Sequence, residues 1–139
     1  MTFVLMIPRK SMHYCALDNE IRIKFFEIYN SKSKNKTCHL SLTIGYKITD
    51  KLCIKPCDRV SFSYDDKNHL KWFIKKVKDN DYSSYKIRKR VPTAKSLFFQ
   101  VTWKVEKLGH PPDELFKINI APHKIVNGGI LIDFDGDFV

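Results

Sequence analysis

The sequence predicts a mainly β fold: a small barrel-like or sandwich domain with one or two short helical turns. Three observations lead to this prediction. Apolar and polar residues alternate with a period of two in several segments, which is typical of half-buried strands. Those segments are rich in Val, Ile, Phe, Tyr and Trp, the residues that strands favour. Polar turns separate them, and no stretch keeps a helical period for more than about two turns.

Length and composition indicate one domain over residues 1–139. The chain is 43% hydrophobic and 13% aromatic, and 139 residues suffice for a single core. No apolar run approaches the roughly 20 residues that cross a bilayer. The apolar start, residues 1–7, is interrupted by Pro8, Arg9 and Lys10 before it reaches the length of a signal-peptide core. We therefore expect a cytoplasmic location and no membrane partner. The four cysteines suit a reducing compartment.

The expected elements follow one another along the chain after an edge strand or arm in residues 2–15. The expected strands are residues 20–29, 38–44, 60–64, 70–75, 97–105, 116–121, 124–127 and 130–132. Loops or turns are expected at residues 30–37, 55–58, 65–68, 79–84, 92–95 and 127–129, and a helical turn at residues 113–114. The parity of the strands predicts one continuous core, made of Val60, Phe62, Leu70, Trp72, Leu97, Phe99, Val101 and Trp103.

The segment from residue 40 to residue 78 combines a strand, a helical turn, a tight turn and a hairpin. Leu52-Cys53-Ile54 ends the helical turn, and Cys57-Asp58-Arg59-Val60 leads into the hairpin. This order resembles the AbrB and MazE swapped-hairpin families of bacterial DNA-binding regulators. In those families a short helix ends in Leu-Gly-Ile, and a Gly-Asp turn precedes two hairpin strands. The segment also looks like one carried by small bacterial and phage proteins. The resemblance implies a β fold, DNA binding and a homodimer.

Two features of the segment depart from the family pattern. Cys57 replaces the turn glycine, so a positive φ costs more at this position. The Gly-Arg…Pro entry to the helix is missing, since Gly45 is followed by Tyr46 and Lys47. The basic residues that contact DNA in those families therefore have no matching positions in this chain.

The charge of the chain is unevenly distributed. Of a net charge of +10, residues 32–107 contribute 19 Lys or Arg against 7 Asp or Glu, or +12. Residues 108–139 contribute 2 against 5, or −3, and we expect residues 133–139 to form an acidic tail. A basic middle indicates a surface that faces a polyanion. The alternative is a lysine-rich surface that serves solubility alone.

The basic middle also contains interleaved aromatic residues, a pattern typical of nucleic-acid binding. The candidate contact residues are Lys71, Lys75, Lys76, Lys78, Lys86, Arg88, Lys89, Arg90 and Lys95. Phe73 and Phe98 lie on the parity opposite to the core, so they are candidates for stacking on bases. Trp72, Phe99 and Trp103 are expected to be packing residues.

Other chemistries lack the residues that they require. Cys53 and Cys57 form one close pair, whereas structural zinc takes two, so we expect no metal site and no cofactor. Asp133, Asp135 and Asp137 lack the remaining positions of a calcium loop. The five histidines are scattered, and no nucleophile motif or glycine-rich phosphate loop accompanies them. We expect a protein that is not an enzyme.

Three functions remain open. The first is an AbrB-like DNA-binding regulator that acts through a basic face. The second is a small phage or mobile-element interaction protein that inhibits a host nucleic-acid-processing or defence complex. The third is a single-strand binder of the oligonucleotide-barrel type. Small β domains carry many functions, so the fold class alone does not decide among them.

Overall fold

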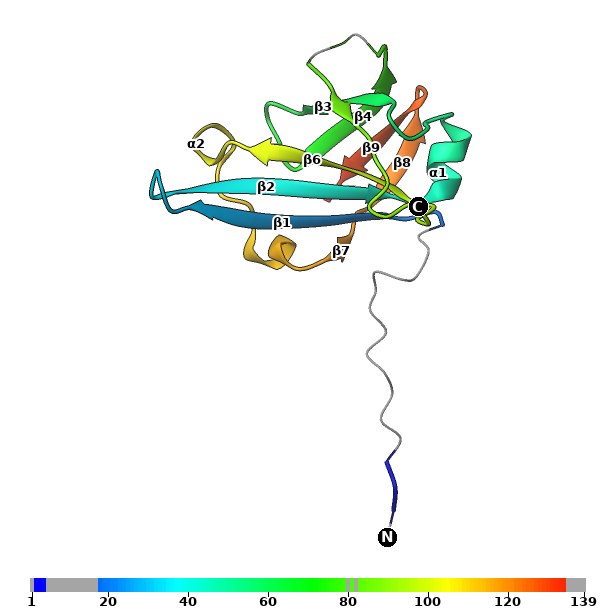
Figure 1. Ribbon diagram of the computed structural model, residues 1–139. Coiled ribbons are helices and arrows are strands. Elements are labelled where there is room, and N and C mark those ends of the chain that lie inside the picture. The colour runs from blue at the N-terminus through cyan, green and yellow to red at the C-terminus, as the bar shows by residue number, and fades with distance from the viewer. Residues whose placement is uncertain (1, 5–17, 80, 82, 135–139) are drawn as a thin grey trace.

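Two antiparallel sheets, stacked as a sandwich rather than a closed barrel, make up the fold (Figure 1). The computed structural model describes residues 2–4, 18–79, 81 and 83–134. In this part of the chain, sheet A has the strand order β6 (Leu97–Trp103), β2 (Asn35–Ile44), β1 (Ile21–Asn30) and β7 (Asn119–Ile120). Sheet B has the order β5 (Tyr85–Lys86), β3 (Arg59–Tyr64), β4 (Lys71–Val77), β9 (Gly129–Asp133) and β8 (His123–Val126). The expected mainly β class is confirmed.

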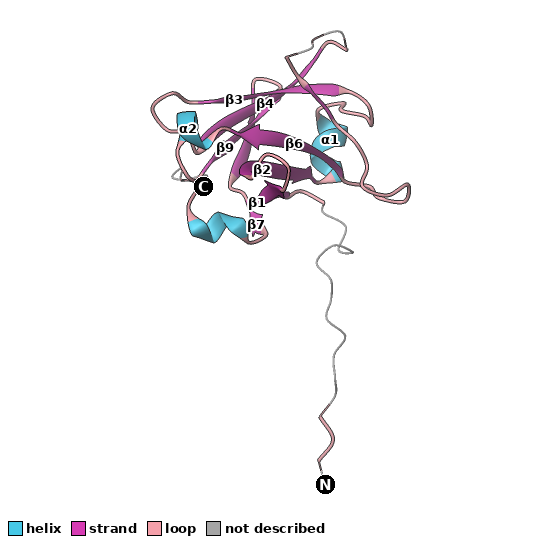
Figure 2. Cartoon of the chain, turned by 60° about the vertical axis from the view of Figure 1, so that its left-hand side comes forward, coloured by secondary structure: helices cyan, strands magenta, loops and turns pink. Residues whose placement is uncertain are grey.

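The helices are short and lie between strands. They are α1 (Tyr46–Lys51), α2 (Val105–Leu108) and the 3-10 helix η1 (Asp113–Phe116), which confirms the expected helical turn. Figures 1 and 2 show α1 and α2 at opposite ends of the sandwich. Among the described residues, no helix has the length and apolar character needed to span a membrane.

Strands β1 and β2 form a long hairpin whose pairing runs from Ile21 opposite Ile44 to Asn30 opposite Asn35. The expected loop at residues 30–37 is too long. The polar residues 35–37, expected in the loop, belong to β2 and pair with residues 28–30 of β1. The turn is shorter because the side chain of Asn30 accepts a hydrogen bond from the Lys32 amide. A tight turn fixes the register, and the pairing then extends into a segment whose composition favours a loop.

The end of α1 has the hydrogen bonds of a Schellman motif. The Cys53 amide donates to the Asp50 carbonyl (3.2 Å), and the Ile54 amide donates to the Thr49 carbonyl (2.8 Å). Cys53 has a φ of +56°, in the left-handed region that glycine usually occupies at this position. Ile54 then packs into the core, as does Ile48 six residues earlier. The helix therefore ends where the sequence predicts, with a cysteine in the place of glycine.

The predicted turn at residues 55–58 is a β-turn with the features of type II. The Asp58 amide donates to the Lys55 carbonyl (3.0 Å), and Pro56 sets the first central position. Cys57 occupies the second central position with a φ of +74°. Type II turns favour glycine or asparagine there, because a Cβ makes a positive φ costly.

Three more predicted elements differ from the structure. The long strand ends at Trp103 rather than at Val105, because the chain turns into α2 and Trp103 donates a hydrogen bond to the Gly109 carbonyl. The strand expected at residues 116–121 is only β7, since Phe116 still belongs to η1. Asp133 is the last residue of β9, paired with Lys71, and not part of a tail. Residues 135–139 and most of the expected arm lie outside the described residues.

The core lies between the two sheets and contains all eight residues predicted for it. Six are buried, namely Val60, Trp72, Leu97, Phe99, Val101 and Trp103, and two are partly buried against them, namely Phe62 and Leu70. Strand β1 adds Ile21, Ile23 and Phe25, which are fully buried. Both tryptophan indoles keep a hydrogen bond inside the core, Trp72 to the His69 carbonyl and Trp103 to that of Gly109.

The two sheets are joined along one edge by a short bridge, which we call the seam. Arg88, just after β5, and Phe98 in β6 each donate a backbone hydrogen bond to the other, at 2.9 Å and 2.7 Å. Ile87, immediately before the seam, is fully buried. The basic run that begins at Lys86 therefore crosses from sheet B to sheet A.

Replacing Trp103 with alanine is expected to lower the free energy of unfolding by about 3–5 kcal/mol, because the side chain is buried and its loss leaves a cavity. Chemical denaturation measures the effect. Thr102→Ala, at the exposed neighbouring position of the same strand, is the control and should stay within about 0.5 kcal/mol of wild type. An unchanged transition for Trp103→Ala would contradict the placement of β6.

Replacing Cys57 with glycine is expected to stabilise the fold by up to about 1 kcal/mol. The left-handed conformation costs a residue with a Cβ about 1–2 kcal/mol, and glycine removes this cost. The greater freedom of glycine in the unfolded chain offsets about 0.5–1 kcal/mol of the gain. Cys57→Ala keeps the Cβ at this exposed position and should match wild type. A thermal melt in which the glycine variant is less stable than the alanine variant would overturn this account of the turn.

Candidate nucleic-acid interface

Side chains that alternate with the core residues form the outer face of each sheet. In β4, Trp72 and Ile74 are buried, so Lys71, Phe73 and Lys75 lie on the outer face of sheet B. The sequence predicts that the two lysines share one side of their strand, and the structure agrees. Strand β3 separates them from β5, so these lysines are two strands away from the basic run.

The run from Lys86 to Arg90 lies at the seam. Ile87 points into the core, which directs Lys86 and Arg88 outward. Arg88 pairs with Phe98, and paired residues of an antiparallel ladder point to the same face. Arg88 and Phe98 therefore share the outer face of sheet A.

Arg90 is fixed above this face by three contacts. Its guanidinium carbon lies 4.2 Å from the centroid of the Phe98 ring, a cation–π distance. Its Nη2 donates to the hydroxyl of Ser41 at 2.7 Å and lies 3.4 Å from that of Thr43. These contacts hold the charged group in one orientation on the open side of the sheet.

Arg22 of β1 brings a second guanidinium close to Arg90. Arg22 pairs with Thr43, and Thr43 pairs with Phe98, so these side chains form one row across three strands. Burial lowers the pKa of Arg90 below its ordinary value, and the positive charge of Arg22 lowers it further. An arginine remains charged in spite of such a shift, so two like charges are held together. We call Arg22, Arg88, Arg90 and Phe98 the seam cluster.

Lys76 lies apart from the other candidate residues because its parity differs from that of Lys71 and Lys75. Its ammonium donates to the Cys53 carbonyl at 2.9 Å and lies 3.2 Å from a carboxylate oxygen of Asp58. Lys76 therefore joins β4 to the turn after α1, and its charge is already compensated.

Three more candidate cations lie in loops. Lys78 follows the end of β4, and Lys89 follows the seam; both are exposed. The ammonium of Lys95 lies 5.4 Å from the ring centroid of Tyr46 in α1. Lys89 and Lys95 belong to the loop that carries Arg90, so they extend the positive charge around the seam cluster.

The two candidate stacking residues are half-buried on outer faces, but their surroundings differ. Phe73 packs over the backbone of Gly129, where an added Cβ would come within 2.5 Å of the ring. Phe98 is covered by the guanidinium of Arg90. A base near Phe98 would therefore meet the guanidinium and not the bare ring.

The sequence prediction missed the part of the surface that β1 and β2 supply. Arg22, Lys24 and Phe26 alternate on the outer side of β1, opposite to the buried residues. The Phe26 ring stacks with that of His39 on β2, with centroids 5.4 Å apart and planes at 21°. The alternation in β1 was visible in the sequence, and its outer parity was the signal that pointed to these residues.

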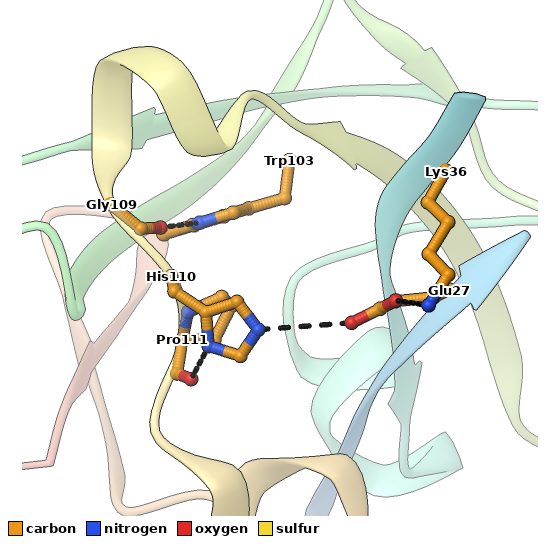
Figure 3. A network of polar contacts seen from close by, with 6 residues as sticks. All are labelled: Glu27, Lys36, Trp103, Gly109, His110 and Pro111. Atoms are coloured by element: carbon orange, nitrogen blue, oxygen red, sulfur yellow. Dashed lines mark hydrogen bonds and ion pairs between the residues drawn. The ribbon is translucent and has the colours of Figure 1, made fainter.

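Cations at the α2 end of the molecule have a carboxylate nearby. Figure 3 shows Glu27 between Lys36 at 4.0 Å and His110 Nε2 at 3.7 Å, while His110 Nδ1 donates to the Pro111 carbonyl. In the described ranges, Arg90 has no carboxylate within 4.0 Å. Lys36 and Arg90 thus differ in whether a described carboxylate lies close to their charge.

Cysteine and metal chemistry is limited in the described residues. They contain no group of three or more His, Cys, Asp or Glu placed to hold a metal ion. Cys38, Cys53 and Cys57 have free thiols. Burial raises the pKa of the Cys38 thiol, and the charge of Glu27 adds to this effect.

No family model, no curated protein and no solved structure matches the chain.

Asp58→Ala is expected to lower the free energy of unfolding by about 1 kcal/mol at neutral pH, the usual worth of one hydrogen bond. The carboxylate accepts a hydrogen bond from the Lys55 amide at 2.7 Å, and this bond, followed by the contact with Lys76, lowers the pKa of Asp58. A lowered pKa in the folded state stabilises the fold above the unfolded value of about 3.9.

The difference in the free energy of unfolding between Asp58→Ala and wild type should therefore shrink as the pH falls below about 3.9 and through the lower pKa of Asp58 in the folded protein. Urea denaturation at a series of pH values tests this. Asp66→Ala, at an exposed position of the β3–β4 turn, is the control and should change stability by less than about 0.5 kcal/mol. A difference that stays constant down to the acid limit would contradict the assigned role of the carboxylate.

Proposed function

We propose that the protein binds nucleic acid, with DNA as the favoured target, through the seam cluster and the lysines around it. The observation that supports this most is the way in which Arg90 is held. The Phe98 ring and the Ser41 hydroxyl fix its guanidinium in place. The charge of Arg22 lies nearby, and none of the described carboxylates forms an ion pair with Arg90. Two like charges held close together favour an anion beside them, and a phosphodiester chain supplies anions in a row.

The wider charge distribution supports the same target. Residues 32–107 carry a net +12, and Lys86, Lys89 and Lys95 lie close to the seam cluster in sequence. Each cation that neutralises a phosphate releases counterions, so affinity rises with the number of contacts and falls with salt. The lysines of β4 would add contacts to a ligand that reaches the outer face of sheet B.

A regulatory role is proposed on the resemblance of residues 40–78 to the AbrB and MazE families. The order of strand, helical turn, tight turn and hairpin matches β2, α1, the turn at residues 55–58, β3 and β4. The left-handed Cys53 and Cys57 stand at the two positions where those families have glycine. Because such folds build their binding face across a dimer, this role also predicts twice the monomer mass in solution.

Replacing Arg88, Lys89 and Arg90 together with alanine is expected to weaken DNA binding by about two orders of magnitude or more at low salt. The slope of log affinity against log salt should fall by about three units, one for each lost phosphate contact. Fluorescence anisotropy over a salt series measures both quantities. Loss of the contacts of Arg90 with Phe98 and Ser41 should cost about 1–2 kcal/mol of stability, so a thermal melt checks that the variant is folded.

A matched control removes the same charge from three exposed lysines outside the seam and its loop, namely Lys67, Lys107 and Lys117. This control should retain most of the affinity. Equal losses in the two variants would reduce the effect to net charge and contradict a site at the seam. If wild type binds neither duplex nor single strand at low salt, the proposal is wrong, and a protein partner, such as a host nucleic-acid-processing or defence complex, becomes the target to test.

A further inference from the structure

The outer face of sheet A carries rings, cations and small polar groups in ordered rows. The pairing of β1, β2 and β6 places Arg22, Thr43 and Phe98 in one row. The next row contains Lys24, Ser41 and Gln100, and the third contains Phe26, His39 and Thr102. Successive rows are two residues apart along the strands, or about 7 Å.

Two flat groups occupy this face at different heights along the strands. The first is the guanidinium of Arg90, which lies over the Phe98 ring at 4.2 Å. The second is the pair of rings from Phe26 and His39, held by a hydrogen bond of 2.9 Å between His39 Nε2 and the Thr37 hydroxyl. The rows of Phe98 and Phe26 are four residues apart, or about 13 Å along the strands.

Hydrogen-bonding side chains lie between and beside these flat groups. Gln100 and Thr102 are exposed on β6, and Lys24 is exposed on β1. An amide side chain can both donate and accept, so it suits the polar edge of a base. Lys24, together with the guanidiniums of the seam cluster, suits phosphates.

Such a face suits unpaired nucleotides better than a duplex. In a duplex the flat faces of the bases are stacked on one another and leave only groove edges and phosphates accessible. Readout of the major groove uses a helix or a two-stranded ribbon that enters it, whereas this surface is a broad sheet. Unpaired bases expose their flat faces, and proteins bind them by stacking on aromatic rings or on the plane of an arginine.

We infer that the outer face of sheet A binds a single-stranded segment of nucleic acid, with one base on the guanidinium of Arg90 and another at the rings of Phe26 and His39. This inference rests on the proposed function and adds the strandedness of the target. It also assigns roles to Lys24, Phe26 and His39.

The experiment compares the affinities of the full chain for labelled oligo-dT and for the same oligonucleotide annealed to oligo-dA, at one low salt concentration. Wild type should bind the single strand more tightly. Arg90→Lys keeps the charge and removes the plane, and Phe26→Leu keeps an apolar residue and removes the ring. Each variant should weaken single-strand binding about 5- to 150-fold, the value of one stacked base, and should leave duplex binding and the salt slope nearly unchanged.

Lys107→Ala at the α2 end serves as the control and should bind both forms as wild type does. Thermal melts show whether each variant is folded. Because Arg90 lies in a loop and Phe26 in β1, one variant keeps the test valid if the other does not fold. Equal affinity of wild type for the two forms, or equal losses on both in the variants, would overturn this inference and leave the proposed function standing. Absence of binding to either form would overturn both.

A parallel measurement with oligo-U distinguishes the two kinds of single strand. Tighter binding to oligo-dT than to oligo-U supports DNA as the target, and the reverse supports RNA on the same face. In both cases the losses in Arg90→Lys and Phe26→Leu should persist. If both variants bind oligo-dT and oligo-U as tightly as wild type does, the assignment of these two residues is wrong.

Discussion

The stacking of the two sheets depends on three interlocked aromatic rings. The centroid of the Phe25 ring lies 5.1 Å from that of Trp103 and 6.2 Å from that of Trp72, and the two tryptophans are 6.0 Å apart. All three pairs meet edge to face, an arrangement that aromatic quadrupoles favour. Phe25 and Trp103 belong to sheet A and Trp72 to sheet B, so the cluster sets how the sheets face each other.

Once these rings are placed, the alternation of each strand decides which residues reach solvent. Burial of Phe25 sends Lys24 and Phe26 outward, and burial of Phe99 sends Phe98 outward to the seam. The loop after the seam then brings Arg90 back over the sheet, where a ring and hydroxyls hold it. The position of the seam cluster thus follows from core packing, and no carboxylate of the described residues forms an ion pair with Arg90.

Strand parity made the core predictable, since burial of alternate residues leaves a direct mark on the sequence. Parity places the strand end at Val105 because that residue continues the alternation. The chain instead turns into α2 there, and the hydrogen bond from the Trp103 indole to the Gly109 carbonyl that accompanies this turn has no local pattern in the sequence. The charge of Arg88 and Arg90 was equally visible in sequence. Their grouping with Arg22 was not, because it depends on which strands become neighbours. Charge alone groups Lys76 with its neighbours, whereas its parity in β4 separates it from Lys75 and its ammonium pairs with Asp58.

The seam bears on how easily the two sheets separate at the edge where Arg88 pairs with Phe98. Two backbone hydrogen bonds between Arg88 and Phe98 hold this edge, and the residues that carry them also carry or border the crowded positive charges. Repulsion between the guanidiniums of Arg22 and Arg90 would favour opening of this edge, and a polyanion bound there as proposed would oppose it. The amide hydrogens of Arg88 and Phe98 would then exchange with solvent deuterium more slowly when the ligand is bound. A bound polyanion would then stabilise the pairing of the two sheets at this edge. The salt concentration would change the stability of the same edge, because salt screens the repulsion between the guanidiniums.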